Sequence, residues 1–235
     1  MLKPSLHIHG HAPAAALRPS EYTSALIQAL RARAACVRGA DALEIGSGSG
    51  VVLAALGALG ASALCGIDIE NEAVVSGSLL LRELGYGNAQ FHQGDMWMPV
   101  AGRRFDLIAA NLPHFPMEPQ EFAGRLASWS SGGPDGRRLL DGFLQGLPAY
   151  LMPGGRAIIT HNAFVGLDRS RAMVEQIGLS LRVVSSTLIH LTREKLDLMT
   201  PSVLCAEEGR SIYRYGPYAF AEMHIVEIGA PEIFG

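Results

Sequence analysis

The sequence is poor in cysteine, in charge and in long apolar runs. Of its 235 residues three are cysteine and 17% are charged. Cys36, Cys65 and Cys205 are odd in number and far apart in apolar surroundings, which indicates free thiols and a reducing, cytoplasmic location. No apolar run approaches the roughly 18 residues of a membrane helix, and the N-terminus lacks the apolar core of a signal peptide. We therefore expect no membrane association and no export.

Strong charge of either sign is also missing. The formal net charge is −3, so nothing global attracts a phosphate backbone, and a nucleic-acid partner is not expected. Hydrophobic residues make up 49% of the chain, which suffices for a sizeable core and is compatible with a homodimer. The length fits one α/β domain with short additions.

The first part of the chain differs from the rest. Residues 1–20 are rich in proline, histidine and alanine without periodicity, which is typical of an extended arm. From Ser20 the spacing of apolar residues predicts a helix that Gly39 closes. We therefore divide the chain into an arm and helix over 1–38 and a main domain over 39–235.

Beyond that point strand-like and helix-like segments alternate. This rhythm predicts a doubly wound, mostly parallel, seven-stranded sheet covered by helices on both faces. Residues between about 190 and 222 have no readable pattern. The predicted strands cover residues 42–45, 64–69, 89–92, 105–110, 156–161, 181–189 and 223–228, and the predicted helices cover residues 51–59, 72–84, 137–151 and 168–176.

A glycine-rich turn follows the first predicted strand and opens a helix. Gly46, Gly48 and Gly50 flank Ser47 in this turn, where absent side chains let the backbone approach a ligand. The spacing differs from the Gly-x-Gly-x-x-Gly fingerprint of dinucleotide sites, so a pyrophosphate matches less well. Glu44, just before the turn, is a candidate partner for the amino end of the ligand or a structural residue.

Carboxylates end the next two strands. Asp68 lies roughly 20 residues after the glycine turn, where a carboxylate can accept both hydroxyls of a ribose, and Ile69 follows it. The alternative for Asp68 is a cap of the following helix. Asp95 could accept from an adenine amino group and Met96 could pack on the ring, although a Gly-Asp pair is more often a turn.

The fourth predicted strand ends in Asn111-Leu112-Pro113-His114-Phe115. The asparagine carbonyl and backbone carbonyls freed by proline could hold a nitrogen that bears two hydrogens, so that its lone pair faces an activated methyl group. The alternative is a stiff loop in which Asn111 caps backbone groups. We name Asn111, Pro113 and His114 as the candidate catalytic residues and Phe115 as a substrate contact.

Together these residues resemble the class I S-adenosylmethionine-dependent methyltransferases over roughly residues 40–162. Asn111-x-Pro113 resembles the Asn-Pro-Pro-Tyr motif of N-methyltransferases. Residues 131–136, Ser-Gly-Gly-Pro-Asp-Gly, resemble the Gly-Gly-x-Asp-Gly stretch of the release-factor glutamine methyltransferases of the HemK/PrmC type. The resemblance implies S-adenosylmethionine as cofactor, bound also by Asn111, and implies that Asn111 binds the amide nitrogen that is methylated.

Two departures point to a different acceptor. Leu112 and His114 stand where that family has proline and tyrosine, and only about 40 residues precede the glycine turn, too few for its docking domain. We therefore expect a nitrogen of a small molecule as the acceptor. The alternatives are a protein amide, an RNA or DNA base, and a scaffold protein without activity. His114 could accept a proton from the acceptor or serve as a polar pocket wall.

The sequence leaves open the roles of two groups of residues, the histidines of the arm and the tyrosines near residue 215. His7, His9 and His11 alternate as metal ligands might, yet no carboxylate or cysteine is near in sequence, so we expect a solvated arm and no metal. Tyr215 and Tyr218 could line the substrate pocket as part of an aromatic lid, and ordinary packing is the alternative.

Overall fold

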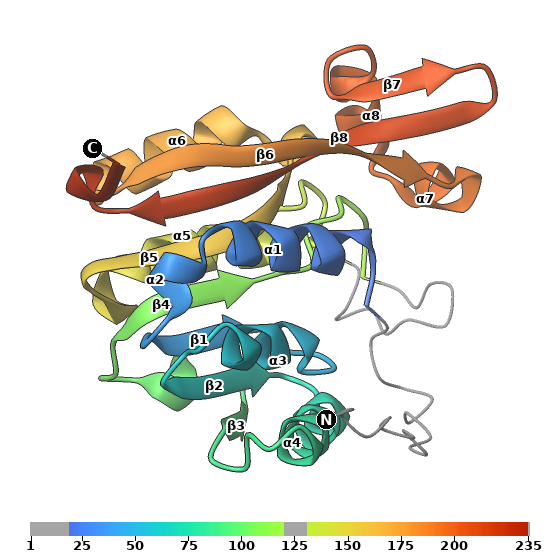
Figure 1. The fold of residues 1–235 in the computed structure, drawn as a ribbon. Helices are drawn as coiled ribbons and strands as arrows, with labels where there is room; N and C mark the ends of the chain where they lie inside the picture. The colour runs from blue at the N-terminus through green and yellow to red at the C-terminus, as the bar shows by residue number, and fades with distance from the viewer. Residues whose placement is uncertain (1–18, 120–130, 235) are drawn as a thin grey trace.

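The computed structural model describes residues 19–119 and 131–234 and forms one α/β unit (Figure 1). The helices are α1 (Glu21–Ala32), α2 (Ala34–Val37), α3 (Val51–Ala58), α4 (Asn71–Glu83), α5 (Arg138–Tyr150), α6 (Leu167–Gln176), α7 (Arg193–Leu198) and α8 (Pro201–Glu207). The strands are β1 (Asp41–Ile45), β2 (Ala63–Asp68), β3 (Gln90–Gln93), β4 (Phe105–Ala110), β5 (Leu151–Asn162), β6 (Ser180–Leu191), β7 (Ile212–Tyr215) and β8 (Tyr218–Gly229).

The strands form a single sheet in the order β3-β2-β1-β4-β5-β8-β6. The first five strands in this order run parallel to one another, and β8 lies between β5 and β6 and is antiparallel to both. The predicted doubly wound, mostly parallel sheet is confirmed. An eighth short strand, β7, lies off this seven-strand path and pairs with β8.

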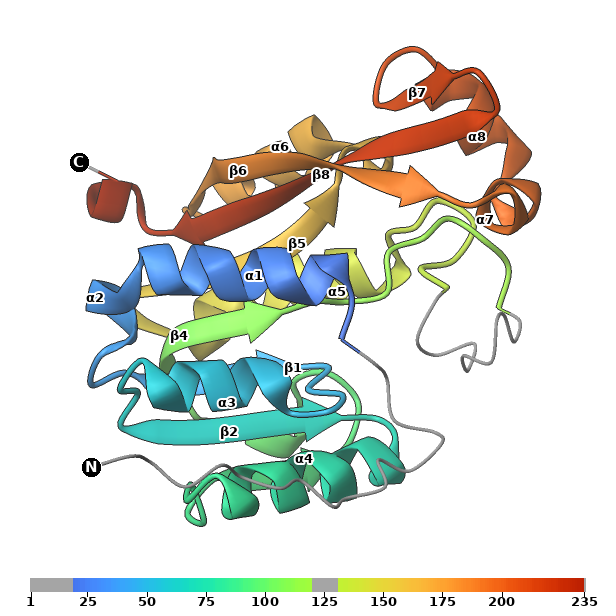
Figure 2. The same cartoon turned by 45° about the vertical axis from the view of Figure 1, so that its right-hand side comes forward.

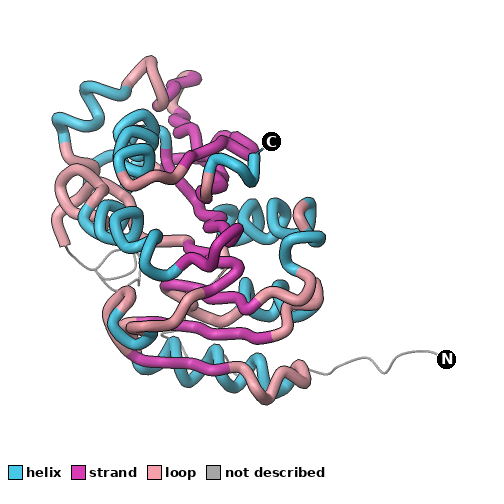
Figure 3. Tube along the Cα trace, turned by 90° about the vertical axis from the view of Figure 1, so that its left-hand side faces the viewer, coloured by secondary structure: helices cyan, strands magenta, loops and turns pink. Residues whose placement is uncertain are grey.

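Helices cover both faces of the sheet, which Figure 3 shows nearly edge-on. Successive residues of a buried strand point to opposite faces, and β4 shows this clearly. Leu107 and Ala109 join a cluster with Leu26 of α1 and Leu53 of α3. Ile108 and Ala110, on the other face, join a cluster with α5 and α6. Strands buried on both faces are the reason that the sequence shows continuous apolar runs rather than alternation.

The helix that the sequence predicts from Ser20 begins as predicted and is interrupted before Gly39. Ser20 precedes α1, and its N–H donates to Oγ1 of Thr23 over 3.2 Å. At Arg33 the backbone leaves helical angles, with φ at −115°, and α2 follows as a single turn. The side chain of Arg33 pairs with the buried carboxylate of Glu227 on β8, 3.1 Å away. This ion pair ties the end of α1 to the central sheet.

The segment without a sequence pattern forms α7, α8 and β7 (Figure 2). It contacts the loop after β4, because the N–H of Thr200 donates to the carbonyl of Pro116 over 2.8 Å. Among the described residues no helix has the length and apolar character needed to cross a membrane.

Candidate functional site

The glycine turn between β1 and α3 is shaped by positive φ angles. They are 71° at Gly46, 49° at Gly48 and 76° at Gly50, in the region that favours glycine. A Cβ on Gly50 would lie 2.9 Å from Cα of Gly77 in α4, so side-chain-free backbone is also required for helix packing. The turn therefore has a defined shape at the carboxyl edge of the sheet.

Asp68 links this turn to the end of β2. Its Oδ2 accepts from the N–H of Gly48 over 2.8 Å, and its Oδ1 accepts from the N–H of Glu70 over 3.0 Å. Burial raises the pKa of Asp68, and the two backbone donors oppose that shift. The bond to Glu70 matches the capping alternative for Asp68. Each oxygen still has a second acceptor position, so a ligand contact is compatible with both bonds.

Glu44 lies beneath the turn and is buried. One of its oxygens accepts from the N–H of Leu53 over 3.2 Å. Burial raises the pKa of Glu44 well above its ordinary value, and the nearby charge of Asp68 adds to the shift. Oγ of Ser47 is buried and has no hydrogen-bond partner within the part of the chain that the structure describes. The hydroxyl of Ser47 in the turn and the buried carboxyl of Glu44 at the end of β1 thus each favour an additional partner of suitable chemistry.

The residues after β2 and β3 are more open. Ile69 is 52% exposed, and Asp95 is exposed as well. Met96 has a φ of 48°, unusual for a residue with a side chain, and packs partly against the core. β2 and β3 are adjacent and parallel, so these residues lie at the same edge of the sheet as the glycine turn.

Asn111 leaves the sheet beside the glycine turn. Ile45 pairs in register with Ala110, so Gly46 and Asn111 are the next residues on neighbouring strands. Oδ1 of Asn111 accepts from the hydroxyl of Thr160, at the end of β5, over 2.8 Å. The structure therefore brings the glycine turn and the predicted acceptor loop together.

His114 is buried in this loop. Its Nε2 accepts from the N–H of Asn162 over 3.2 Å, and burial lowers the pKa of its ring to about 4. Its Nδ1 has no partner with good hydrogen-bond geometry among residues 19–119 and 131–234. A neutral ring whose Nε2 is already occupied is poorly suited to accept a proton, so the geometry favours the pocket-wall alternative.

The stretch over 131–136 packs directly on this loop. The N–H of Gly132 donates to the carbonyl of Phe115 over 2.8 Å, and Oγ of Ser131 donates to the carbonyl of Met117 over 2.6 Å. A Cβ on Gly132 would lie 2.7 Å from Cα of His114, so only a glycine fits at this position without a clash. The two segments that carry the narrower resemblance are thus in contact. The ring of Phe115 lies edge-on to Phe164, 5.9 Å between centroids, and packs against the core.

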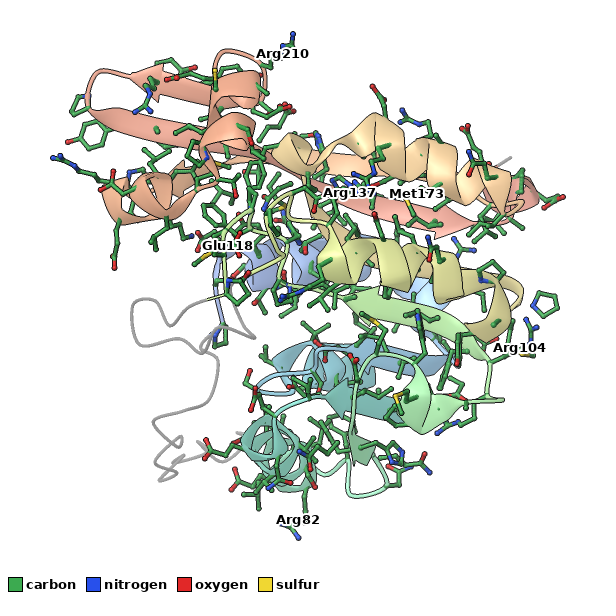
Figure 4. All side chains as sticks on the ribbon, turned by 180° about the vertical axis from the view of Figure 1, so that it is seen from behind. Arg82, Arg104, Glu118, Arg137, Met173 and Arg210 are labelled. Atoms are coloured by element: carbon green, nitrogen blue, oxygen red, sulfur yellow. The ribbon has the colours of Figure 1, made fainter. Side chains whose placement is uncertain are left out.

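Arg137, at the start of α5, has a structural environment. Its guanidinium is buried and donates to the carbonyl of Val165 over 2.6 Å and to Oγ of Ser170 over 3.0 Å. It also pairs with Asp141, and Figure 4 labels it beside Met173. These partners join α5 to α6 and leave Arg137 engaged within the protein.

Tyr215 and Tyr218 lie apart from the other predicted site residues. They occupy the tip of the β7–β8 hairpin, which projects beyond the body of the sheet (Figures 1 and 2), and are 61% and 59% exposed. Their described ring contacts are with Phe220 and His190. Their predicted role in the pocket therefore has no support from these contacts.

The histidines of the arm cannot be placed. His7, His9 and His11 lie outside the described residues. Within residues 19–119 and 131–234 no group of three or more histidine, cysteine or acidic side chains is arranged to hold a metal ion.

Two residues that the sequence analysis did not name, Thr160 and Asn162, lie beside Asn111 and His114. Thr160 and Asn162 end β5, and the hydroxyl of Tyr22 in α1 donates to Oδ1 of Asn162 over 3.1 Å. The available signal was the polar run Thr160-His161-Asn162 after three apolar residues of a predicted strand. Polar residues at the carboxyl end of a parallel strand are candidates for a ligand site, as at the four preceding strands.

Comparisons with known proteins give relatives for this chain. Residues 42–131 match a family described as a methyltransferase domain. The chain is 32% identical over 151 residues to a putative protein N5-glutamine methyltransferase of Methanocaldococcus jannaschii, a match covering 63% of this chain and 74% of that protein. It is 36% identical over 160 residues to methyltransferase HEMK2 of Homo sapiens, with 63% of this chain and 73% of that protein covered.

A solved structure agrees on the fold. The structure of the Mtq2–Trm112 complex of E. cuniculi, described as responsible for methylation of the eRF1 translation termination factor, matches with a TM-score of 0.58. The match covers 91% of this chain and 98% of the other at 14% identity, a level at which it shows the fold alone.

Proposed function

Since the chain belongs to the class I S-adenosylmethionine-dependent methyltransferases, and within them to the HemK-like proteins, we propose that it methylates the side-chain amide nitrogen of a glutamine in a protein. The single observation that carries this proposal is the register between β1 and β4. It places Gly46 and Asn111 side by side, so that a cofactor on the glycine turn would adjoin an amide held by Asn111.

The glycine turn fits S-adenosylmethionine. Positive φ angles at Gly46 and Gly48 give this turn a backbone shape that favours residues without a Cβ atom, while Gly50 allows the close packing of the turn on α4. The buried hydroxyl of Ser47, which has no partner in the described chain, suits a polar ligand group. When bound, this cofactor supplies a methyl group activated on a sulfonium sulfur.

Residues around the glycine turn are suited to contact the amino group, the ribose and the adenine of the cofactor. We assign Glu44 to the amino group, because a positive charge beside this buried carboxyl stabilises its ionised form. We assign Asp68 to the ribose hydroxyls through the acceptor positions that its backbone bonds leave open. Asp95 and Met96, with Ile69, are assigned to the adenine end.

The acceptor loop suits a planar amide. Oδ1 of Asn111 can accept one N–H of an amide, and a backbone carbonyl near Pro113 can accept the other. Holding both hydrogens fixes the plane of the nitrogen, and correct orientation alone supplies a large share of the rate. The buried, neutral ring of His114 forms one wall, where the family motif has tyrosine.

The relatives favour a protein acceptor over the small molecule that the sequence analysis expected. That expectation rested on Leu112 and His114 in the acceptor loop and on the small number of residues before the glycine turn, which leaves no room there for a docking domain of the family's kind. The M. jannaschii relative is named for protein glutamine methylation although the match already covers 74% of it, so such a domain is not a general requirement. We therefore propose a protein substrate, and with it a cytoplasmic location consistent with free thiols at Cys36, Cys65 and Cys205.

An RNA or DNA base is the less favoured acceptor, given a net charge of −3. The non-enzymatic scaffold is set aside by the membership in an enzyme family.

The test uses methyl-labelled S-adenosylmethionine and competing acceptors. Purified enzyme is incubated with a translation termination factor of the same organism, with free glutamine and small amines, and with total RNA. We expect label in the protein, lost when its acceptor glutamine is replaced by asparagine. Label confined to small amines or to RNA would contradict the proposal and restore the corresponding alternative.

A further inference from the structure

The end of β5 presents polar residues to two faces. Ile158 joins the cluster on the α1 face, and Ile159 joins the cluster on the α5 face. By strand alternation Thr160 and Asn162 share the α1 face, while Nε2 of His161 contacts Oγ of Ser170 on the other face, 2.8 Å away. Thr160 and Asn162 are thus set on the side where the acceptor loop begins.

Thr160 bonds the amide that we assign to the acceptor. Ala110 pairs in register with Ile159, so Asn111 and Thr160 are the next residues on adjacent strands. The buried hydroxyl of Thr160 donates to Oδ1 of Asn111 over 2.8 Å. That oxygen has two acceptor positions, and the bond uses one and leaves one for a substrate N–H. Without the bond, the Asn111 amide loses the contact that fixes its rotation.

Asn162 contacts His114, at the far end of the acceptor loop from Asn111. Its N–H donates to Nε2 of His114, which places the ring proton of the neutral histidine on Nδ1. Its Oδ1 accepts from the hydroxyl of Tyr22, and the Tyr22 ring lies edge-on to the His114 ring, 6.1 Å between centroids. An aromatic ring from α1 therefore stands beside the position where the family motif has tyrosine.

We propose that Thr160 and Asn162 are positioning residues for the methyl acceptor. Thr160 holds the side-chain amide of Asn111 in the rotation that presents its oxygen. Asn162, with Tyr22, holds His114 as a fixed neutral wall. The substrate class that this arrangement fits is a flat primary amide, and in this respect the inference rests on the proposed function.

The test separates positioning from folding. Thr160→Val keeps the shape and removes the hydroxyl, Thr160→Ser keeps the hydroxyl, and Thr187→Val is a matched control on the exposed part of β6. We expect Thr160→Val to lower kcat about tenfold with the Kd for S-adenosylmethionine unchanged, and Thr160→Ser to restore most of it. A loss of thermal stability with unchanged kcat would overturn the proposal, and so would equal losses in the two Thr160 variants.

A second readout does not depend on the acceptor. The side-chain amide signals of Asn111 in a ¹⁵N–¹H spectrum should move in Thr160→Val, return in Thr160→Ser and stay in place in Thr187→Val. Unmoved signals in Thr160→Val would overturn the inference even if the enzyme is active. If glutamine methylation fails while the signals move as expected, the proposed substrate is wrong and the positioning role stands.

Tyr22→Phe tests the other half of the arrangement. It keeps the ring beside His114 and removes the bond to Asn162. We expect kcat to fall severalfold with the Kd for S-adenosylmethionine unchanged. An unaltered kcat would remove Tyr22 from the positioning set and overturn that part of the proposal.

Discussion

The carboxylate of Asp68 accepts a hydrogen bond from the N–H of Gly48, a residue of another strand end, over 2.8 Å. The bond couples the shape of the glycine turn to the end of β2. Asp68, which we propose as the partner of the cofactor ribose, therefore also supports the glycine turn that we propose for the rest of the cofactor.

Asp68→Ala should weaken the binding of S-adenosylmethionine at least tenfold, because it removes the ribose acceptor and the anchor of Gly48 together. Calorimetric titration measures the effect. Asp168→Ala, at an aspartate whose side chain is 99% exposed on α6, is the control and should bind as wild type does. Equal affinities for Asp68→Ala and wild type would contradict the assignment.

Gly50→Ala should destabilise the fold more than the same change at Gly85. Both glycines have positive φ, 76° and 89°, which costs an alanine roughly 1 to 2 kcal/mol. Only at Gly50 would the new Cβ also meet backbone, 2.9 Å from Cα of Gly77, whereas nothing lies within 4 Å at Gly85. Urea unfolding of the two variants compares the free energies. Equal losses would mean that the approach of α3 to α4 is less tight than described.

His114 should make stability depend on pH in the acid range. Its pKa is lowered to about 4 by burial, while an unfolded histidine titrates near about 6.5. The unfolded state therefore binds the proton first, and stability that is complete above about pH 6.5 is lost as pH falls toward 4. His161, whose pKa is lowered to about 3, acts in the same direction.

In His114→Gln, a side-chain amide takes the place of Nε2, and this amide does not titrate. Chemical unfolding between pH 7.5 and pH 4.5 should show a shallower loss than in wild type, by up to about 1.4 kcal/mol per pH unit. An identical slope in both proteins would show that His114 is protonated in the folded state as readily as in the unfolded state.

Glu227→Gln should be strongly destabilising. The carboxylate on β8 is fully buried and pairs with Arg33, Arg156 and Arg182, which lie 2.8–3.1 Å away. These partners hold the pKa of Glu227 below its usual range despite its burial. Removing the charge leaves three guanidinium groups without their shared partner, at a cost of about 3 kcal/mol.

The control for this substitution is Glu222→Gln on the same strand, where the carboxylate is partly exposed. Thermal unfolding should leave this variant near wild type. If Glu227→Gln is as stable as Glu222→Gln, the ion cluster does not hold α1, β5 and β6 to β8.

The sequence predicts best which residues end the parallel strands and therefore share one edge of the sheet. Gly46, Asp68 and Asn111 each follow an apolar run, and parallel strands bring such positions to one edge. The partnership of Thr160 with Asn111 depends on the register of β4 and β5, which no local pattern encodes. α7 and α8 are too short for a helical period to stand out, and the low pKa of His114 arises from burial by segments distant in sequence.

The most direct test of the account is the position of the transferred methyl group and its dependence on Asn111. Fragment mass spectra of the acceptor protein should place one methyl group on the side-chain nitrogen of a glutamine. Asn111→Ala should slow its appearance about 100-fold while S-adenosylmethionine still binds. A methyl group on any other atom, or an unchanged rate in Asn111→Ala, would contradict the account.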